Sequence, residues 1–175
     1  MPFSSFRDGC RKPRGLRLRL ALWFLLASLS IGALADDEQD CTAAGGSLLV
    51  GDVVSPLKFR RGTVLEGIEL SHTHVMLKGD ADAKTYDVAI DNVFASGYQN
   101  NMNVVPSPLN SIQVGDKLEV CGIPYAGGMD WVHTNCGAPP TPSDPNGWVK
   151  KIAADGSVGP NLEVTQTYCY LWQHK

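Results

Sequence analysis

The sequence predicts an all-β protein, a small five-stranded antiparallel barrel with an extra C-terminal hairpin and two disulfides. Residues 36–175 contain no sustained apolar period of 3.6 residues. Several short runs instead alternate apolar and polar side chains, the pattern of half-buried strands. Gly, Pro, Asn and Asp residues separate these runs and are typical of turns. Four cysteines follow residue 36, an even number that predicts two disulfides.

The first 35 residues are predicted to be a signal peptide. Six Arg and Lys residues precede an apolar stretch at 20–33, which leads into Ala33-Leu34-Ala35 and then an acidic run. A basic start, an apolar core and an A-x-A cleavage signal are the parts of a secretory leader. The apolar stretch is shorter than the roughly 20 residues of a membrane span. We therefore expect a secreted or periplasmic protein with no membrane span after leader removal.

Removing the leader leaves an acidic chain. Of the 15 basic and 18 acidic residues, 9 and 17 lie beyond residue 35, which gives a net charge of −8. This charge argues against nucleic acid as a partner, because such binding needs several Lys or Arg side chains on phosphates. The only compact basic patch is Lys58, Arg60 and Arg61. The acidic segment 36–47 is expected to be loosely ordered up to Cys41, and residues 48–175 to form a single barrel domain.

The strands are expected in chain order. The clearest alternation lies at 84–93, where Tyr86, Val88 and Ile90 share one face. Residues 95–113 are amide-rich and contain Pro106 and Pro108, which predict a long loop with a short helical turn near 109–112. The hairpin that follows turns at 126–128. Expected strands occupy 47–54, 59–70, 72–78, 84–93, 117–122, 129–136, 148–152 and 161–172.

The cysteines Cys41, Cys121, Cys136 and Cys169 allow three disulfide connectivities. In the predicted hairpin, Cys121 and Cys136 point to opposite faces, which disfavours a bond between them. We favour Cys41–Cys121 with Cys136–Cys169, although the sequence does not exclude the other connectivities. No C-x-x-C pair occurs, so neither a thioredoxin-type site nor a zinc knuckle is indicated.

The Gly115–Gly122 stretch, Gly-Asp-Lys-Leu-Glu-Val-Cys-Gly, is typical of oligonucleotide/oligosaccharide-binding (OB) barrels. Over residues 62–156 the chain also resembles a family of small secreted bacterial proteins of uncharacterised function with an OB-like barrel pattern. Thr134 and Asn135 stand where that family has a second His and an Asp. The resemblance implies the barrel and export, and it implies no particular activity. The matching motifs are Gly62-Thr63-Val64, His74-Val75-Met76-Leu77, Val114-Gly115-Asp116, Trp131-Val132-His133 and Gly147-Trp148-Val149.

The candidate binding residues surround the predicted return strand of the hairpin. An aromatic ring beside a histidine and an amide suits a glycan or peptide ligand, because the ring stacks while the polar groups orient. The alternative is that Trp131 packs in the core or against Trp148, and that His133 is structural. The candidate residues are Trp131, His133, Asn135, Asp144 and Trp148.

A second candidate site is a metal set of His72, His74 and His133, of the three-histidine kind that zinc accepts. His72 and His74 are two residues apart on one expected strand and therefore share a face. The bland alternative is two polar residues at the start of a strand. No phosphate-binding glycine loop, nucleophile elbow or His-Glu-x-x-His helix occurs.

Three functions follow from these features. The favoured one is a non-catalytic binding or interaction module without a cofactor, whose partner is an unidentified protein, peptide or glycan. The second is a small metal-assisted hydrolase with zinc on the histidine cluster. The third is single-stranded nucleic-acid binding by an OB-like face, which the net charge disfavours.

Overall fold

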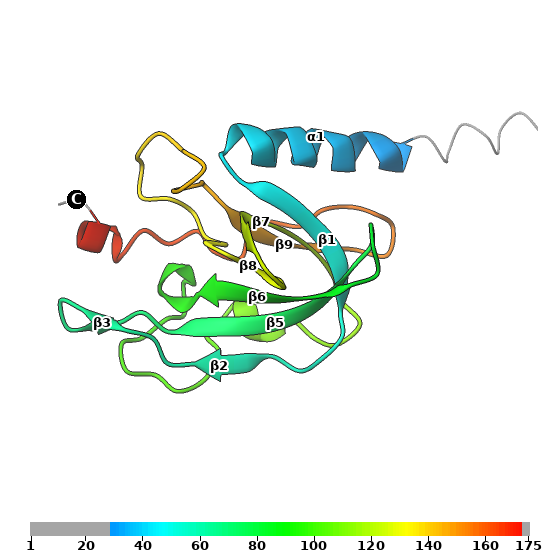
Figure 1. Cartoon of the computed structure of the whole chain (residues 1–175). Helices are drawn as coiled ribbons and strands as arrows, with labels where there is room; N and C mark the ends of the chain where they lie inside the picture. Colours follow the sequence, from blue (N-terminus) through cyan, green and yellow to red (C-terminus); the bar gives the residue numbers. More distant parts are fainter. Residues whose placement is uncertain (1–28, 173–175) are drawn as a thin grey trace, which may run out of the picture.

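A computed structural model describes residues 29–172 (Figure 1). Most of the predicted signal peptide lies outside these residues. Five strands form a closed barrel in the order β1-β5-β6-β8-β7, and β7 returns to pair with β1. Among the strand pairings of residues 29–172, only that of β6 with β8 is parallel. This strand order is that of the OB-type barrel, so the predicted fold class is confirmed. The barrel strands are β1 (Ser47–Val53), β5 (His72–Gly79), β6 (Thr85–Asp91), β7 (Lys117–Tyr125) and β8 (Gly128–Asp130).

Four further strands decorate the barrel. Strand β2 (Lys58–Arg60) extends the sheet by pairing with β5, and β3 (Val64–Leu65) and β4 (Ile68–Glu69) form a small separate hairpin. Strand β9 (Trp148–Ile152) pairs with β7. The chain then turns back so that Ile152 bridges to Val158, which is a shortened form of the predicted C-terminal hairpin.

The barrel core follows from strand alternation. On β5, Thr73, Val75 and Leu77 are buried, whereas His72 and His74 lie on the outer face. Residues of β6, β7, β8 and β9 complete one apolar cluster. Strand β8 approaches β6 closely at Gly128, where a Cβ atom would collide with the backbone oxygen of Asp87. The apolar core includes Val53, Val75, Leu77, Val88, Ile90, Leu118, Val120, Met129, Val132 and Val149.

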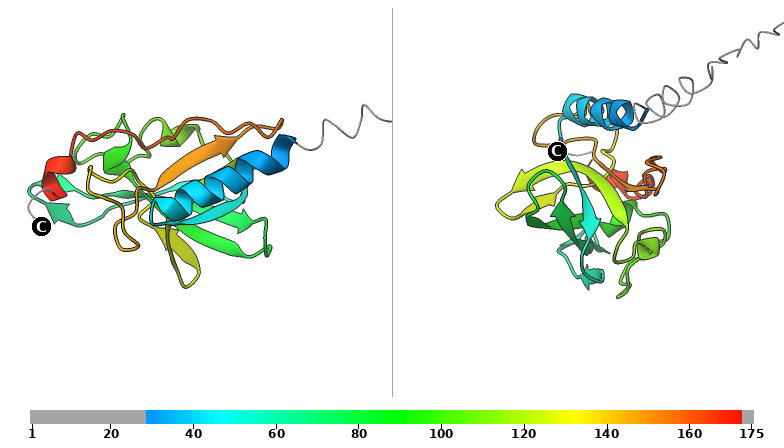
Figure 2. Two further views of the ribbon diagram at one scale, coloured as in Figure 1. Left: turned by 90° about the horizontal axis from the view of Figure 1, so that it is seen from above. Right: turned by 90° about the vertical axis from the view of Figure 1, so that its right-hand side faces the viewer.

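The segment expected to be loosely ordered is helical instead. Helix α1 (Leu29–Ala43) runs through the predicted cleavage site and lies along β1 and β9 (Figure 2). Asp37 and Cys41 are four residues apart and therefore share one helix face. That face contacts the barrel through a 3.2 Å ion pair between Asp37 and Lys150 and through the Cys41–Cys121 disulfide. These contacts are polar and covalent, so an apolar period could not reveal them. Within residues 29–172, no helix is both long and apolar enough to span a membrane.

Two expected strands are wrong, and a third, at 59–70, is divided among β2, β3 and β4. The return strand of the hairpin ends at Asp130, not at residue 136, because Trp131 adopts a left-handed conformation with φ of 54°. Residues 161–172 form no strand and end in a 3₁₀ turn at Cys169–Trp172. The expected shared face there is also wrong, because Leu162 is buried whereas Val164 is 60% exposed. The short helical turn expected within the long loop is confirmed as a 3₁₀ turn at Leu109–Ser111.

Both favoured disulfides are present. Cys41 bonds to Cys121, which joins α1 to β7, and Cys136 bonds to Cys169, which joins the segment after β8 to the C-terminal turn. Paired cysteines are typical of an oxidising, extracytoplasmic environment.

We expect Lys150→Met to lower the free energy of unfolding by about 3 kcal/mol, because it leaves a buried carboxylate without its cation. The Lys150 ammonium lies 2.8 Å from Glu119, whose side chain is fully buried. Lys151→Met is the matched control, because Lys151 pairs with the more exposed Asp116; it should cost less than about 1 kcal/mol. Urea denaturation measures both. Equal losses in the two variants would contradict this role of Lys150.

Candidate functional site

A cavity of about 550 Å³ opens beside the end of β8. Its lining comes from the turn after β6, the segment after β8 and the C-terminal turn, which are far apart in sequence. The Cys136–Cys169 disulfide fixes two of these segments to each other. The left-handed backbone of Trp131 turns the chain away from the strand, and the Asp130 carboxylate accepts a 2.8 Å hydrogen bond from the Trp131 backbone N–H. The lining residues are Phe94, Trp131, His133, Asn135, Cys136, Gly137, Ala138, Asp144 and Trp172.

Aromatic rings form much of the cavity wall. Phe94 and His133 are parallel, with ring centroids 4.3 Å apart, and Trp172 stacks on Phe94 at 5.4 Å. Trp131 lies 5.3 Å from His133 at a tilt of 35°. His133 is almost fully buried, whereas Trp131 is partly exposed. A ligand in the cavity would therefore meet an aromatic surface that is already ordered.

The polar lining residues differ in their freedom to bind a ligand. The Asn135 side chain donates to the Ala138 carbonyl and accepts from the Gly137 backbone N–H, so it holds its own loop. Asp144 also lines the cavity, and its backbone pairs with Thr141. Because no hydrogen bond or ion pair within residues 29–172 engages its carboxylate, Asp144 is the polar lining residue we expect to accept hydrogen bonds from a ligand.

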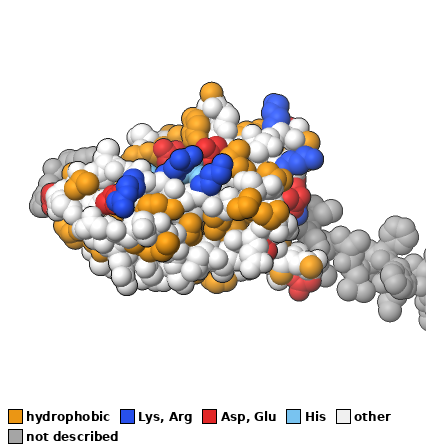
Figure 3. Space-filling view, turned by 90° about the horizontal axis from the view of Figure 1, so that it is seen from below, with side chains coloured by type: hydrophobic (Ala, Val, Ile, Leu, Met, Phe, Trp, Pro, Cys, Tyr) orange, Lys and Arg blue, Asp and Glu red, His pale blue; other side chains and the backbone are white. Residues whose placement is uncertain are grey.

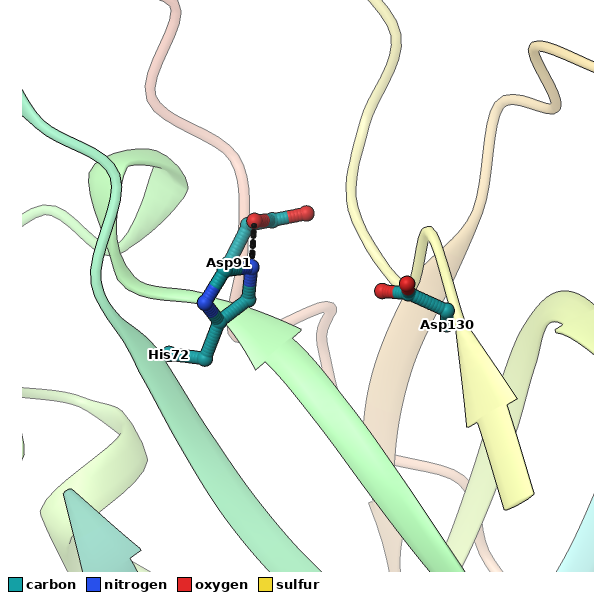
Figure 4. A group of neighbouring side chains, drawn as sticks. All are labelled: His72, Asp91 and Asp130. Atoms are coloured by element: carbon teal, nitrogen blue, oxygen red, sulfur yellow. Dashed lines mark ion pairs between the residues drawn. The ribbon is translucent and has the colours of Figure 1, made fainter. Parts of the chain in front are cut away.

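Asp91, the last residue of β6, joins two of the predicted histidines. One carboxylate oxygen lies 2.7 Å from His72 Nε2, and the other lies 3.4 Å from His133 Nε2. Asp130, at the end of β8, faces the His72–Asp91 pair (Figure 4). One ligand atom each from His72, Asp91 and Asp130 lies within 4.8 Å of the others.

The neighbouring Asn92 holds the His72–Asp91 pair in place. It is fully buried, and its side-chain amide donates to Ser71 Oγ at 3.0 Å. The Thr73 hydroxyl donates to the Asn92 amide oxygen. Asn92 therefore bonds to the residues on either side of His72, which is the residue that pairs with Asp91 across the two strands.

The structure does not bring the three histidines together as one set. His74 pairs with Asp87 at 2.8 Å, and its ring centroid lies 6.4 Å from that of His72. His72 and His133 instead converge on Asp91, which sequence reasoning missed. The sequence feature that could have revealed Asp91 is the four-residue turn after Gly79, where the Gly79 N–H donates to the Lys84 carbonyl. Counting back from this turn pairs His72 with Asp91.

Trp148 lies outside the cavity, unlike the other four candidate binding residues. Its Nε1 donates a 3.0 Å hydrogen bond to the buried Glu119, and the Lys150 ammonium lies 4.5 Å from the centre of its ring. Trp148 therefore belongs to the buried Glu119–Lys150 cluster between β7 and β9, and Lys150 in turn pairs with Asp37 of α1.

Burial and charge shift the acid–base behaviour of this cluster. The hydrogen bond to Asp91 raises the pKa of His72, although burial opposes it, and the charges of Asp91 and Asp130 add to the increase. Burial alone would raise the pKa of Asp91, but the hydrogen bond from His72 and the charges of His133 and His72 lower it overall. Full burial raises the pKa of Glu163 well above its usual value, and the nearby charge of Asp91 adds to this effect.

No protein-family model, curated protein or solved structure matches this chain significantly. The resemblance noted from the sequence therefore stays a prediction, and the candidate site is defined by its own geometry.

Glu163→Gln is expected to reduce the fall in stability at rising pH. Because burial raises the folded-state pKa, the folded protein binds more protons than the unfolded chain above pH 4.5. The contribution of Glu163 to the free energy of unfolding is therefore fully present below that pH. It is lost as pH rises toward the folded-state pKa, by up to about 1.4 kcal/mol per pH unit. Urea denaturation between pH 4 and 8 in EDTA would measure this slope. Glu38→Gln on the exposed face of α1 is the control; identical slopes in the two variants would contradict the assignment.

Proposed function

We propose that the protein is an exported, non-catalytic binding module that holds a neutral glycan segment in the cavity beside β8. The observation that carries this proposal is the aromatic wall of Trp131, Phe94 and Trp172 next to the Asp144 carboxylate. Sugar rings present flat apolar faces bordered by hydroxyl groups. The ring of Trp131 suits the apolar face, and the carboxylate of Asp144 accepts hydrogen bonds from hydroxyls.

Size and charge support this choice of ligand. The cavity volume lies within the usual range of small-molecule sites, roughly 300 to 1,000 Å³. The acidic chain, with a net charge of −8 beyond residue 35, would repel an anionic polymer and favours a neutral ligand. Secretion or periplasmic residence is part of the proposal, supported by the leader sequence and the two disulfides.

Nucleic-acid binding receives weaker support. Strand β2 places Lys58 and Arg60 beside His74 on the outer face of the barrel, and basic side chains gather around a histidine there (Figure 3). OB barrels use this face for oligonucleotides. The acidic side chains of Asp87 and Asp91 lie on the same face, however, and oppose phosphate binding.

Trp131→Asn should weaken glycan binding by about 5-fold or more, since stacking on an aromatic ring contributes on the order of 1 kcal/mol. Asn tolerates the left-handed backbone at this position, so the fold should survive. The measurement is a glycan array followed by a tryptophan-fluorescence titration with the neutral oligosaccharides that score.

Trp148→Phe is the matched control, because it removes an indole outside the cavity. We expect it to bind like the wild type. Binding of peptides but not glycans, or equal affinity in Trp131→Asn and the wild type, would contradict the proposed ligand or the proposed site.

A further inference from the structure

We propose that His72, Asp91 and Asp130 bind a divalent transition-metal ion of the zinc class, with His133 positioned on the other side of Asp91. This site is separate from the glycan proposal and needs no ligand in the cavity. It also differs from the three-histidine set expected from the sequence. The carboxylates of Asp91 and Asp130 replace His74 and His133 as ligands.

The barrel topology brings the three ligands to one end. Asp91 ends β6 and Asp130 ends β8, and these strands are parallel, so both carboxylates leave the barrel at the same end. His72 begins β5, which is antiparallel to β6 and pairs it directly with Asp91. Figure 4 shows the His72–Asp91 pair facing Asp130 across a gap.

The spacing is close to that of a bound metal. One nitrogen and two carboxylate oxygens lie within 4.8 Å of one another. Two atoms at about 2.1 Å from a tetrahedral zinc ion are roughly 3.4 Å apart. Binding one ion therefore requires the most distant of the three atoms to approach one another by about 1.4 Å at most, and the His72 Nε2–Asp91 pair, at 2.7 Å, to separate by roughly 0.7 Å.

Charge at the cluster favours a cation. The carboxylates of Asp91 and Asp130 lie here, and within residues 29–172 neither forms an ion pair with a Lys or Arg. Glu163 is fully buried, and neither of its oxygens has a hydrogen-bond partner. Burying a carboxyl group without a hydrogen-bond partner is costly, and a divalent ion bound to Asp91 would offset the Asp91 charge that Glu163 faces.

His133 supports the proposed ligand Asp91 from its other side. Its Nδ1 lies 2.9 Å from the Thr134 carbonyl oxygen, and its Nε2 lies 3.4 Å from Asp91 Oδ2. The ring also stacks on Phe94. Contacts of this kind to a ligating carboxylate orient it and tune the affinity for the metal.

The same two strands supply a natural control. His74 and Asp87 form a 2.8 Å pair of the same chemistry. Within the described part of the chain, no third His, Cys, Asp or Glu completes a ligand group around that pair. Lys58 and Arg60 line the surface next to it and disfavour a cation. If a His–Asp pair alone were enough to bind a metal ion, the His72–Asp91 and His74–Asp87 pairs would bind it equally.

The experiment uses the untagged protein after EDTA treatment. Isothermal titration with Zn²⁺ should give one ion per chain, and Co²⁺ should give a visible d–d absorption band. His72→Gln and Asp130→Asn should each weaken Zn²⁺ binding by about 100-fold or more, while His133→Phe, which keeps the stack on Phe94, should weaken it by roughly 10-fold. His74→Gln should leave binding unchanged.

Circular dichroism and thermal melting in EDTA establish that each variant is folded, so that lost binding is not lost structure. The proposal is overturned if the folded wild type binds neither Zn²⁺ nor Co²⁺. It is also overturned if His74→Gln weakens binding as much as His72→Gln and Asp130→Asn do, because the metal then sits elsewhere on the outer face.

Discussion

The parallel pairing of β6 with β8 is the constraint on which the rest of the structure depends. It closes the barrel, and it brings the last residues of both strands, Asp91 and Asp130, to the same end. The antiparallel partner of β6 begins there with His72. Because β8 ends as soon as Trp131 turns left-handed, the following segment folds over this end and places His133 against Phe94 and Asp91. A cavity and a histidine–aspartate cluster therefore lie side by side.

His133 is the physical link between the two sites. One face of its ring stacks on Phe94 in the cavity wall, and its Nε2 faces the Asp91 carboxylate. The Cys136–Cys169 disulfide holds the segment that carries this ring against the C-terminal turn. His133 therefore provides a direct physical path between Asp91 and the cavity.

Much of the barrel could be predicted from the sequence because half-buried strands alternate, as in β6, and because turn residues bound them. Helix α1 could not, because its attachment through Asp37 and Cys41 leaves no apolar period. Strands were expected at 129–136 and 161–172 because their apolar and polar residues alternate. In the structure, the left-handed backbone of Trp131 ends the first strand, and contacts between loops determine the conformation of the second segment. Four of five candidate binding residues line one cavity, but Trp148 instead donates a hydrogen bond to Glu119 of β7, a contact between distant segments. Asp91 was missed because its role depends on cross-strand register rather than on spacing along the chain.

The most direct test of this account is anomalous diffraction at the zinc absorption edge from crystals of the zinc-treated protein. The account predicts one strong peak at the end of the barrel, about 2.0 to 2.2 Å from His72 Nε2 and from one oxygen each of Asp91 and Asp130. A peak at His74 and Asp87, or strand ends of β6 and β8 that lie apart with no peak between them, would contradict it.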